Sequence, residues 1–195
     1  MQHLARRSLL SLLLVGLVAL AAGPAAAAPE TYDVDTGHSA LLFRIKHVDV
    51  GYTYGRFNEF SGSLVVDDEN LAAAKVEITA KLESVDTNDA KRDQHLKSPD
   101  FFNANQFPTM GFKSTSVTKT GDEWAVQGNF TLHGVTKAVT IKMTKTGEGK
   151  DPYGNERIGF EGGMRIKRSD FGMDKMQEAV GDKVWVTVAI EGIKK

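Results

Sequence analysis

The sequence contains no cysteine. Disulfide bonds, a thiol nucleophile, a redox dithiol and cysteine-ligated metal sites are therefore excluded, and so is lipid attachment at a lipobox cysteine. If the chain is exported, its stability has to come from packing and hydrogen bonding.

Long hydrophobic runs are also scarce, with one exception at the N-terminus. The chain opens MQHLARR and continues SLLSLLLVGLVALAAG, an apolar segment of about fifteen residues that ends in the alanine cluster 25–28. A membrane-spanning helix needs about twenty apolar residues, so this pattern predicts a secretory signal peptide over residues 1–27, with a retained membrane anchor as the alternative. We place cleavage after Ala27, because Pro29 would be unfavourable directly after the cut. The prediction implies a periplasmic or secreted protein without stable membrane insertion.

Charge of one sign is not in excess. Removing residues 1–27 takes away Arg6 and Arg7 and no acid, which leaves 22 basic and 25 acidic residues. This near balance gives no overall electrostatic signature of nucleic-acid binding, and we expect no nucleic-acid partner. The remaining 168 residues, 28–195, suit one domain with a full core, and no linker or low-complexity segment interrupts them.

Most of residues 28–195 follow the period of two that is typical of half-buried strands. Val76, Ile78, Ala80 and Leu82, for example, alternate with charged or polar neighbours. Polar turns separate the segments, as at Asp151-Pro152-Tyr153-Gly154. Strands are predicted at residues 41–48, 52–57, 62–67, 75–83, 110–118, 124–132, 135–143, 158–167 and 183–191.

This pattern predicts an all-β meander with one helix, for which a sandwich and a barrel both fit the strand count. Gly128, Gly162 and Gly163 lie inside strand patterns, where glycine marks bulges and sharp bends. They favour the barrel. A closed barrel of about eight strands also removes open edges and can hold one small ligand.

The helix is predicted near residues 88–97, within a stretch that continues RDQHLKSPDFF. Thr87, Asn88 or Asp89 would cap its start, and Pro99 disfavours helix at Ser98. Asp93 and His95 are two positions apart, so they would point to different faces and would not form one metal site or dyad. We interpret the segment as structural, with Leu96, Phe101 and Phe102 as apolar anchors.

Chemistry-bearing motifs are few. His38, His47, His95 and His133 show neither HxH nor HxxxH spacing, so no metal site is predicted. No GxSxG motif surrounds a serine. The ten phenylalanines, two tryptophans and Met164, Met173 and Met176 instead suggest a packed core or a long apolar pocket with an adaptable wall.

Ordered sequence blocks carry a family resemblance. They are Tyr32-Asp33-Val34-Asp35, His38-Ser39, Phe43, His47, Gly55-Arg56-Phe57, Phe60-Ser61-Gly62, Arg92-Asp93-Gln94-His95-Leu96, Asp100-Phe101-Phe102, Phe107-Pro108, Phe112-Lys113-Ser114, Gly128 to Thr136, Arg168 to Gly172 and Val180-Gly181-Asp182. In this order and spacing the chain resembles the YceI-like family of secreted bacterial polyisoprenoid-binding proteins. The resemblance covers nearly all of residues 32–191.

The resemblance implies an eight-stranded antiparallel, extended lipocalin-like barrel around an elongated apolar pocket. Its ligand would be a long-chain isoprenoid or fatty amide, without cofactor or known catalytic residues. Homodimers occur among family members, so the resemblance allows a homodimer. Asn129-Phe130 stands where a leucine is more common, a change that could resize the pocket.

We therefore expect a carrier for a long-chain amphiphile. The apolar lining candidates, chosen as strand positions, are Phe43, Ile45, Phe112, Trp124, Phe130, Ile141, Phe160 and Met164. The candidates for a head group at the mouth, chosen by charge and resemblance, are Arg44, His47, Arg92 and Arg168. Two rival hypotheses are a hydrolase or isomerase using His47 or His95, and a structural or stress-related envelope protein with a filled barrel.

Overall fold

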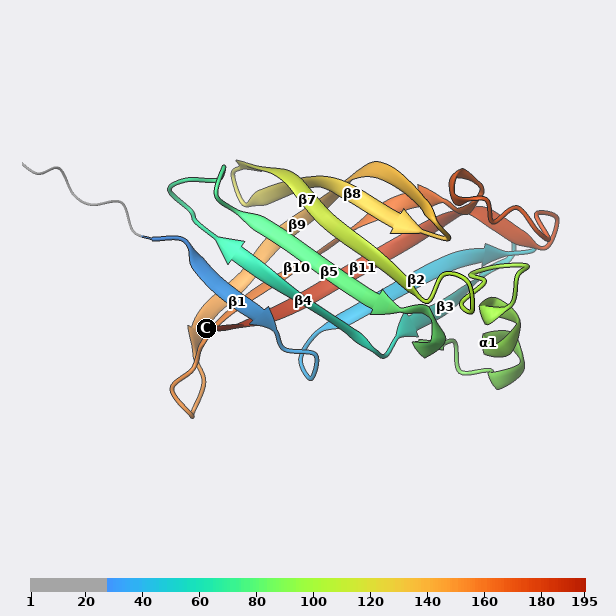
Figure 1. Ribbon diagram of the computed structural model, residues 1–195, viewed down its shortest axis with the longest axis horizontal. Coiled ribbons are helices and arrows are strands. Elements are labelled where there is room, and N and C mark those ends of the chain that lie inside the picture. The colour runs from blue at the N-terminus through green and yellow to red at the C-terminus, as the bar shows by residue number, and fades with distance from the viewer. Residues whose placement is uncertain (1–27) are drawn as a thin grey trace, which may run out of the picture.

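The computed structural model describes residues 28–195, so the predicted signal peptide lies outside the described residues. The elements are β1 Glu30–Val34, β2 Ala40–His47, β3 Gly51–Phe57, β4 Phe60–Val66, β5 Lys75–Lys81, β6 Val85–Asp86, α1 Ala90–Lys97, β7 Thr109–Thr120, β8 Glu123–Leu132, β9 Val135–Lys150, β10 Glu156–Lys167 and β11 Val180–Lys194, with 3-10 turns at Leu82–Ser84 and Arg168–Phe171 (Figure 1).

Eight of the strands close into an antiparallel barrel in the order β1-β4-β5-β7-β8-β9-β10-β11, and β1 returns to pair with β11. The predicted eight-stranded barrel with one helix is confirmed. β1 was not among the predicted strands, because Glu30–Val34 is short and Tyr32 is its single buried side chain. It nevertheless closes the barrel, since Tyr32 pairs with Lys194 on one side and Leu64 on the other.

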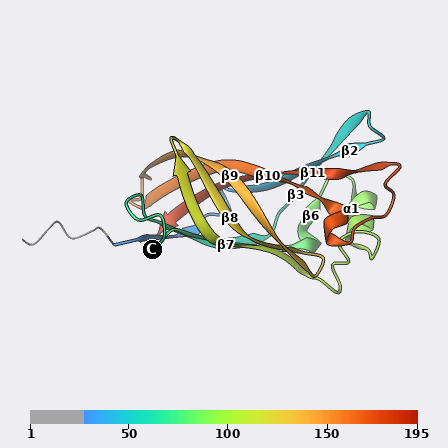
Figure 2. The same cartoon turned by 90° about the horizontal axis from the view of Figure 1, so that it is seen from above.

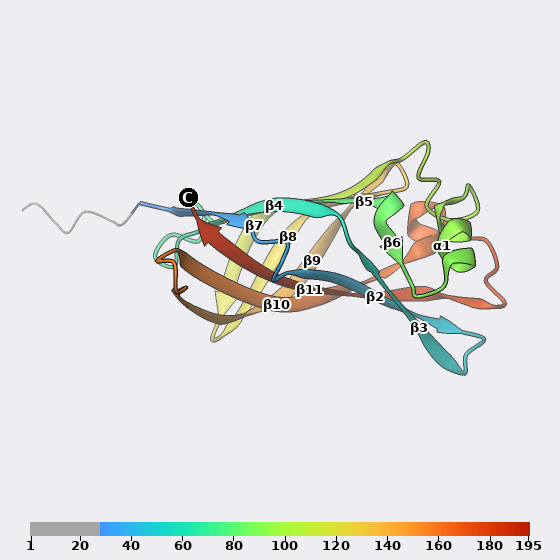
Figure 3. The same cartoon turned by 90° about the horizontal axis from the view of Figure 1, so that it is seen from below.

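The remaining strands extend the sheet beyond the barrel. β11 pairs with β1 near its end and with β2 over Val180–Ala189, and β2 continues into β3 and the short β6. Ser39 lies between the two partners of β11, where its hydroxyl accepts the Glu191 N–H at 2.9 Å. The β2–β3 hairpin projects from the end of the molecule that carries α1, and it turns away from the helix (Figures 2 and 3).

Glycines permit the close strand approaches that the curvature requires. A Cβ at Gly162 would collide with the backbone of Lys142 and Met143, and one at Gly128 would collide with the Lys113 carbonyl and the Phe112 ring. The β7–β8 register shifts next to Gly128, between Ser114 and Ser116, which gives the bend expected of a bulge.

Helix α1 begins and ends as the sequence predicts. Asp89 is the N-cap, and its side chain accepts the Arg92 N–H at 3.0 Å. Ser98, directly before Pro99, is extended and ends the helix. The following turn packs Phe101 and Phe102 against the barrel interior. Within residues 28–195, no helix is both long enough and apolar enough to cross a membrane.

Candidate functional site: an apolar cavity inside the barrel

The barrel encloses a cavity of about 180 Å³. Its walls come from the inward-facing positions of the barrel strands, from β2, and from the segment after α1. The lining side chains are aliphatic, aromatic or methionine, apart from Lys75 and Arg168. A cavity of this composition can bury a hydrocarbon chain, and it offers little to a charged group.

All eight apolar residues predicted from the sequence line this cavity. Phe43 and Ile45 come from β2, Phe112 from β7, and Trp124 and Phe130 from β8. The β9 and β10 strands contribute the other three, Ile141, Phe160 and Met164. Their shared position follows from the alternation, which turns every second residue of a barrel strand inward. Their role in binding a ligand stays a prediction.

The four predicted head-group residues are not brought together. Arg44 lies on the outer face of β2, with its guanidinium carbon 4.8 Å from the centre of the Tyr52 ring. His47 is exposed at the end of β2. Arg92 donates from Nε to the Thr87 hydroxyl at 2.8 Å and from Nη2 to the Thr87 carbonyl at 2.7 Å. Of the four, the cavity lining includes Arg168 alone.

Arg168 is 3% exposed, and each nitrogen of its guanidinium donates to a backbone carbonyl. Nε donates to the Gly181 carbonyl at 3.0 Å, Nη1 to Met173 at 2.6 Å and Nη2 to Val180 at 2.8 Å. Burial lowers the pKa of this guanidinium, while Asp182 and Asp174 oppose that effect. These bonds fasten the loop 172–179 across the start of β11. Met173 and Val180 also line the cavity, so Arg168 shapes its wall.

The RDQHL segment shows the structural arrangement expected from the sequence. Asp93 accepts the Thr87 N–H at 2.8 Å, whereas His95 points elsewhere and lies 3.1 Å from Asp100. His95 and Asp100 are both about half exposed, and neither lines the cavity. The segment anchors the chain instead through Leu96, which contributes to the cavity wall.

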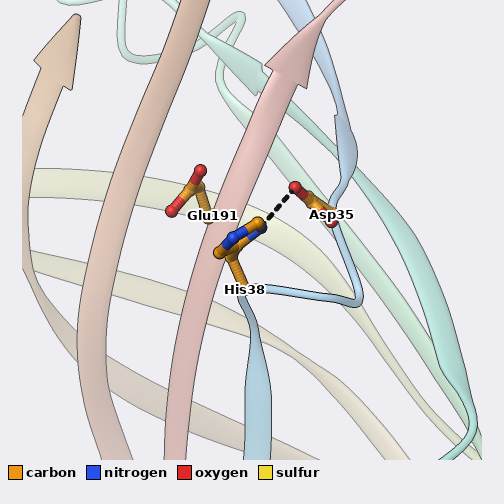
Figure 4. Close-up of side chains that lie close together, drawn as sticks. All are labelled: Asp35, His38 and Glu191. Carbon is orange, nitrogen blue, oxygen red and sulfur yellow. Dashed lines mark hydrogen bonds and ion pairs between the residues drawn. The ribbon is translucent and has the colours of Figure 1, made fainter. Parts of the chain in front are cut away.

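A second polar cluster lies where β1 and β2 meet β11. Asp35, His38 and Glu191 place ligand-type atoms within 4.8 Å of one another (Figure 4). Arg157 already neutralises these carboxylates, since Nη1 contacts Asp35 at 2.6 Å and also contacts Glu191. Its hydrogen bond, followed by that of His38, lowers the pKa of Asp35 to about 2. This arrangement is an ion-pair network that ties β1, β10 and β11 together.

Trp124 carries an unusual polar atom. Its side chain is 4% exposed and packs edge-on against Phe160, with the ring centres 5.5 Å apart. Among the side chains of residues 28–195, the indole N–H is the buried polar group without a hydrogen-bond partner. An unpaired buried donor costs about 1–3 kcal/mol, so Trp124 contributes apolar surface at some expense in stability.

Several wall residues were not among the predicted ligand-binding residues. They are Leu41, Leu64, Ile78, Met110, Val184, Val186, Val188 and Ile190 on strands, and Leu96, Phe101 and Phe102 in α1 and the turn after it. The alternation in β5 and β11 could have indicated the strand positions. Of the two loop methionines expected as part of the wall, Met173 is buried and lines the cavity, whereas Met176 is 46% exposed. It follows Met173 in an irregular loop, where no periodicity indicates direction.

Comparison with protein families matches the YceI-like domain to residues 32–192. A UPF0312 protein of Pseudomonas aeruginosa is 44% identical over 186 residues, covering 95% of this chain and 97% of the relative. A UPF0312 protein of Yersinia pseudotuberculosis is 42% identical over 180 residues, covering 92% of this chain and 94% of the relative.

Solved structures share the fold. Burkholderia cenocepacia BcnA aligns with a TM-score of 0.74 and 26% identity, over 81% of this chain and 98% of that protein. A Campylobacter jejuni YCEI protein aligns with a TM-score of 0.70 and 29% identity, over 77% and 90%. A polyisoprenoid binding domain from Saccharophagus degradans aligns with a TM-score of 0.65 over 84% and 98%, and at 15% identity it shows the fold alone.

Proposed function

Since the chain belongs to the YceI-like domain family, we propose that it is a carrier that holds one long-chain amphiphilic lipid in its barrel cavity. The observation that carries the proposal is the continuous apolar lining of an enclosed space. The polyisoprenoid-binding domain with the same fold supports an isoprenoid ligand, and an isoprenoid quinone or a fatty amide has the same kind of tail. The carrier would act in the periplasm, or outside the cell, after removal of residues 1–27.

The hydrophobic effect sets a scale for the tail. Each methylene buried in the cavity contributes about 0.8 kcal/mol. Twelve buried methylenes contribute about 10 kcal/mol before the costs of association and ordering, whereas micromolar binding requires a net of about 8 kcal/mol. A tail that fills the cavity is therefore favoured over a shorter chain.

The polar contacts bear on the head group. The Arg168 guanidinium donates hydrogen bonds to three backbone carbonyls, and the Arg92 guanidinium donates to Thr87. Neither presents a free guanidinium to the cavity. The other cation of the lining, Lys75, is exposed, so a diphosphate deep in the cavity would lack a cationic partner there and its desolvation would be costly. We infer that the head group is uncharged or remains outside the cavity.

The test is mass spectrometry of organic extracts from protein purified out of its own periplasm without detergent. A stoichiometric long-chain species supports the carrier and identifies the ligand class. Met164→Trp, which narrows the cavity, should reduce this species, whereas Thr118→Trp on the exposed face of β7 should not. Protein that is empty and that also fails to take up isoprenoid quinones and fatty amides would instead favour the filled structural barrel.

A further inference from the structure

The outer surface of β10, β11 and the β2–β3 hairpin combines cations with aromatic and aliphatic side chains. Register places Arg165 opposite Trp185, Trp185 opposite Arg44, and Arg44 opposite Tyr54. Opposed residues in a sheet share one face. We call this surface the basic-aromatic face, defined by Leu42, Arg44, Lys46, Val48, Val50, Tyr52, Tyr54, Arg165, Lys167, Lys183 and Trp185.

The cations of this face are not held in close ion pairs in the described part of the chain. Within residues 28–195, none of Arg44, Lys46, Arg165, Lys167 and Lys183 takes part in an ion pair. Elsewhere on the barrel, exposed lysines such as Lys81 and Lys113 lie beside glutamates. The near-neutral total charge is therefore unevenly distributed, and this face is locally positive, which favours an anionic partner.

The aromatic residues hold two of these cations in place. Tyr52 and Trp185 pack edge-to-face with ring centres 5.4 Å apart, and the Arg44 guanidinium lies 4.8 Å and 5.4 Å from the two rings. The Lys46 ammonium lies 5.2 Å from the Tyr52 ring. Tyrosine and tryptophan combine an apolar body with a polar edge, which suits them to the boundary between water and lipid.

The hairpin tip adds exposed apolar groups. Val50 is 86% exposed and Val48 is 49% exposed, and both flank Asp49 in the turn between β2 and β3. The hairpin projects clear of the barrel (Figure 3). Its turn, residues 48–50, therefore carries two exposed valines at the end of the protrusion. Exposed aliphatic side chains next to basic and aromatic residues are typical of proteins that bind peripherally to membranes.

The face is continuous with the cavity wall. Phe43 and Ile45 on β2, and Val184 and Val186 on β11, point inward and line the cavity, while their neighbours Arg44 and Trp185 point outward. A membrane in contact with the outer face of these strands would therefore be separated from the cavity by a single β-sheet. The end of the cavity marked by Ile45 and Val180 lies at the base of the protruding hairpin.

We propose that the basic-aromatic face docks the protein on an anionic phospholipid surface, with the tip of the β2–β3 hairpin inserted among the head groups. The biological purpose rests on the proposed carrier function, because docking brings the cavity to the bilayer where an amphiphile is taken up or delivered. Binding is peripheral and reversible, driven by cation–head-group attraction and a small buried apolar area.

Vesicle flotation tests the proposal. The probes are vesicles of phosphatidylglycerol and phosphatidylethanolamine in equal parts, and vesicles of phosphatidylcholine alone. The protein should float with the anionic vesicles and not with phosphatidylcholine, and high salt should release it. The double variant Arg44→Gln, Lys46→Gln should weaken partitioning about thirtyfold, since each basic residue near such a surface contributes about fivefold.

The matched control removes two cations from the opposite side of the barrel, in Lys81→Gln, Lys113→Gln. It should float like the unaltered protein. Val50→Asp, at a side chain without core contacts, should weaken flotation while leaving the urea unfolding midpoint unchanged. Equal loss in the control, or equal flotation with both kinds of vesicle, would overturn the proposal.

Other partners give different results. If the face binds polyanions in general, the protein will bind immobilised duplex DNA but will not float with anionic vesicles. That result rejects lipid docking. If the face binds a second copy of the chain, the unaltered protein will sediment as a dimer and will not float with vesicles. Val50→Asp will then convert the dimer to a monomer, and lipid docking is again rejected. The carrier function is tested separately by uptake of a quinone that is added from ethanol in the absence of vesicles. Uptake without flotation refutes docking alone, and absence of uptake refutes the carrier function.

Discussion

Replacing Arg168 with lysine separates a structural role for this residue from head-group binding. The guanidinium spans three carbonyls, those of Met173, Val180 and Gly181, at 2.6 to 3.0 Å. A lysine ammonium keeps the positive charge, but it lacks the planar fork and is shorter, so we expect it to reach one carbonyl. Two buried carbonyls then lose a charged donor.

Each such hydrogen bond contributes about 1.5–3 kcal/mol, so Arg168→Lys should lower the free energy of unfolding by about 3–6 kcal/mol. With a urea dependence of about 2 kcal/mol per molar, the unfolding midpoint should fall by about 1.5–3 M. The measurement is urea unfolding monitored by tryptophan fluorescence. Arg165→Lys, at an exposed position three residues earlier on β10, should change stability by less than about 0.5 kcal/mol.

The refuting result is specific. An unchanged midpoint in Arg168→Lys, together with loss of a phosphorylated isoprenoid that the unaltered protein binds, would show that the guanidinium serves the ligand. Loss of stability in Arg168→Lys, with the ligand class unchanged when the variant is kept well below its unfolding midpoint, supports the structural assignment.

Three further predictions concern the barrel and its wall. Gly162→Ala should destabilise the protein by about 1–3 kcal/mol or more, because its Cβ meets backbone on β9, whereas Gly147→Ala has open space and should be neutral in the same thermal unfolding assay. The pKa of Asp35 is lowered to about 2 in the fold, so its ion pairs stabilise the protein above about pH 4, and this contribution is lost as the pH falls towards 2. Asp35→Asn should therefore show a shallower loss of stability across that interval, and an unchanged slope would contradict the assignment. Trp124→Phe removes an unpaired buried N–H while keeping an aromatic ring. Its free energy of unfolding, from urea denaturation followed by far-ultraviolet circular dichroism, should therefore fall by less than the about 3–5 kcal/mol expected for Trp124→Ala, and an equal loss would contradict this.

The strands and the cavity wall were predictable where alternation is strong. Trp124, Val126, Phe130 and Leu132 are all buried on one side of β8, as their spacing predicts. Because a barrel has one interior, residues predicted to face inward on separate strands had to converge, and the eight apolar candidates did so. β1 escaped prediction because closure of the barrel depends on backbone pairing with β4 and β11, which leaves little pattern in five residues.

Polar residues were harder to place, because charge does not indicate the direction in which a side chain makes its bonds. Arg44 and Arg168 have the same chemistry in the sequence. One lies on an outward position of β2 against Tyr52, while the other sits at the end of β10, where the chain turns and buries it. A buried guanidinium needs acceptors, and the loop 172–179 supplies carbonyls that no residue pattern reveals.

The same geometry explains why the basic-aromatic face is invisible in the linear sequence. Its cations come from positions 44–46, 165–167 and 183, which pair only because β11 lies between β2 and β10. Because successive side chains of a strand point to opposite faces, inward residues such as Ile45 and Val184 form the cavity wall while the outward residues face solvent. Substitutions confined to the outward positions should therefore alter vesicle docking without changing ligand uptake. That separation makes vesicle docking and ligand uptake independently measurable in one molecule.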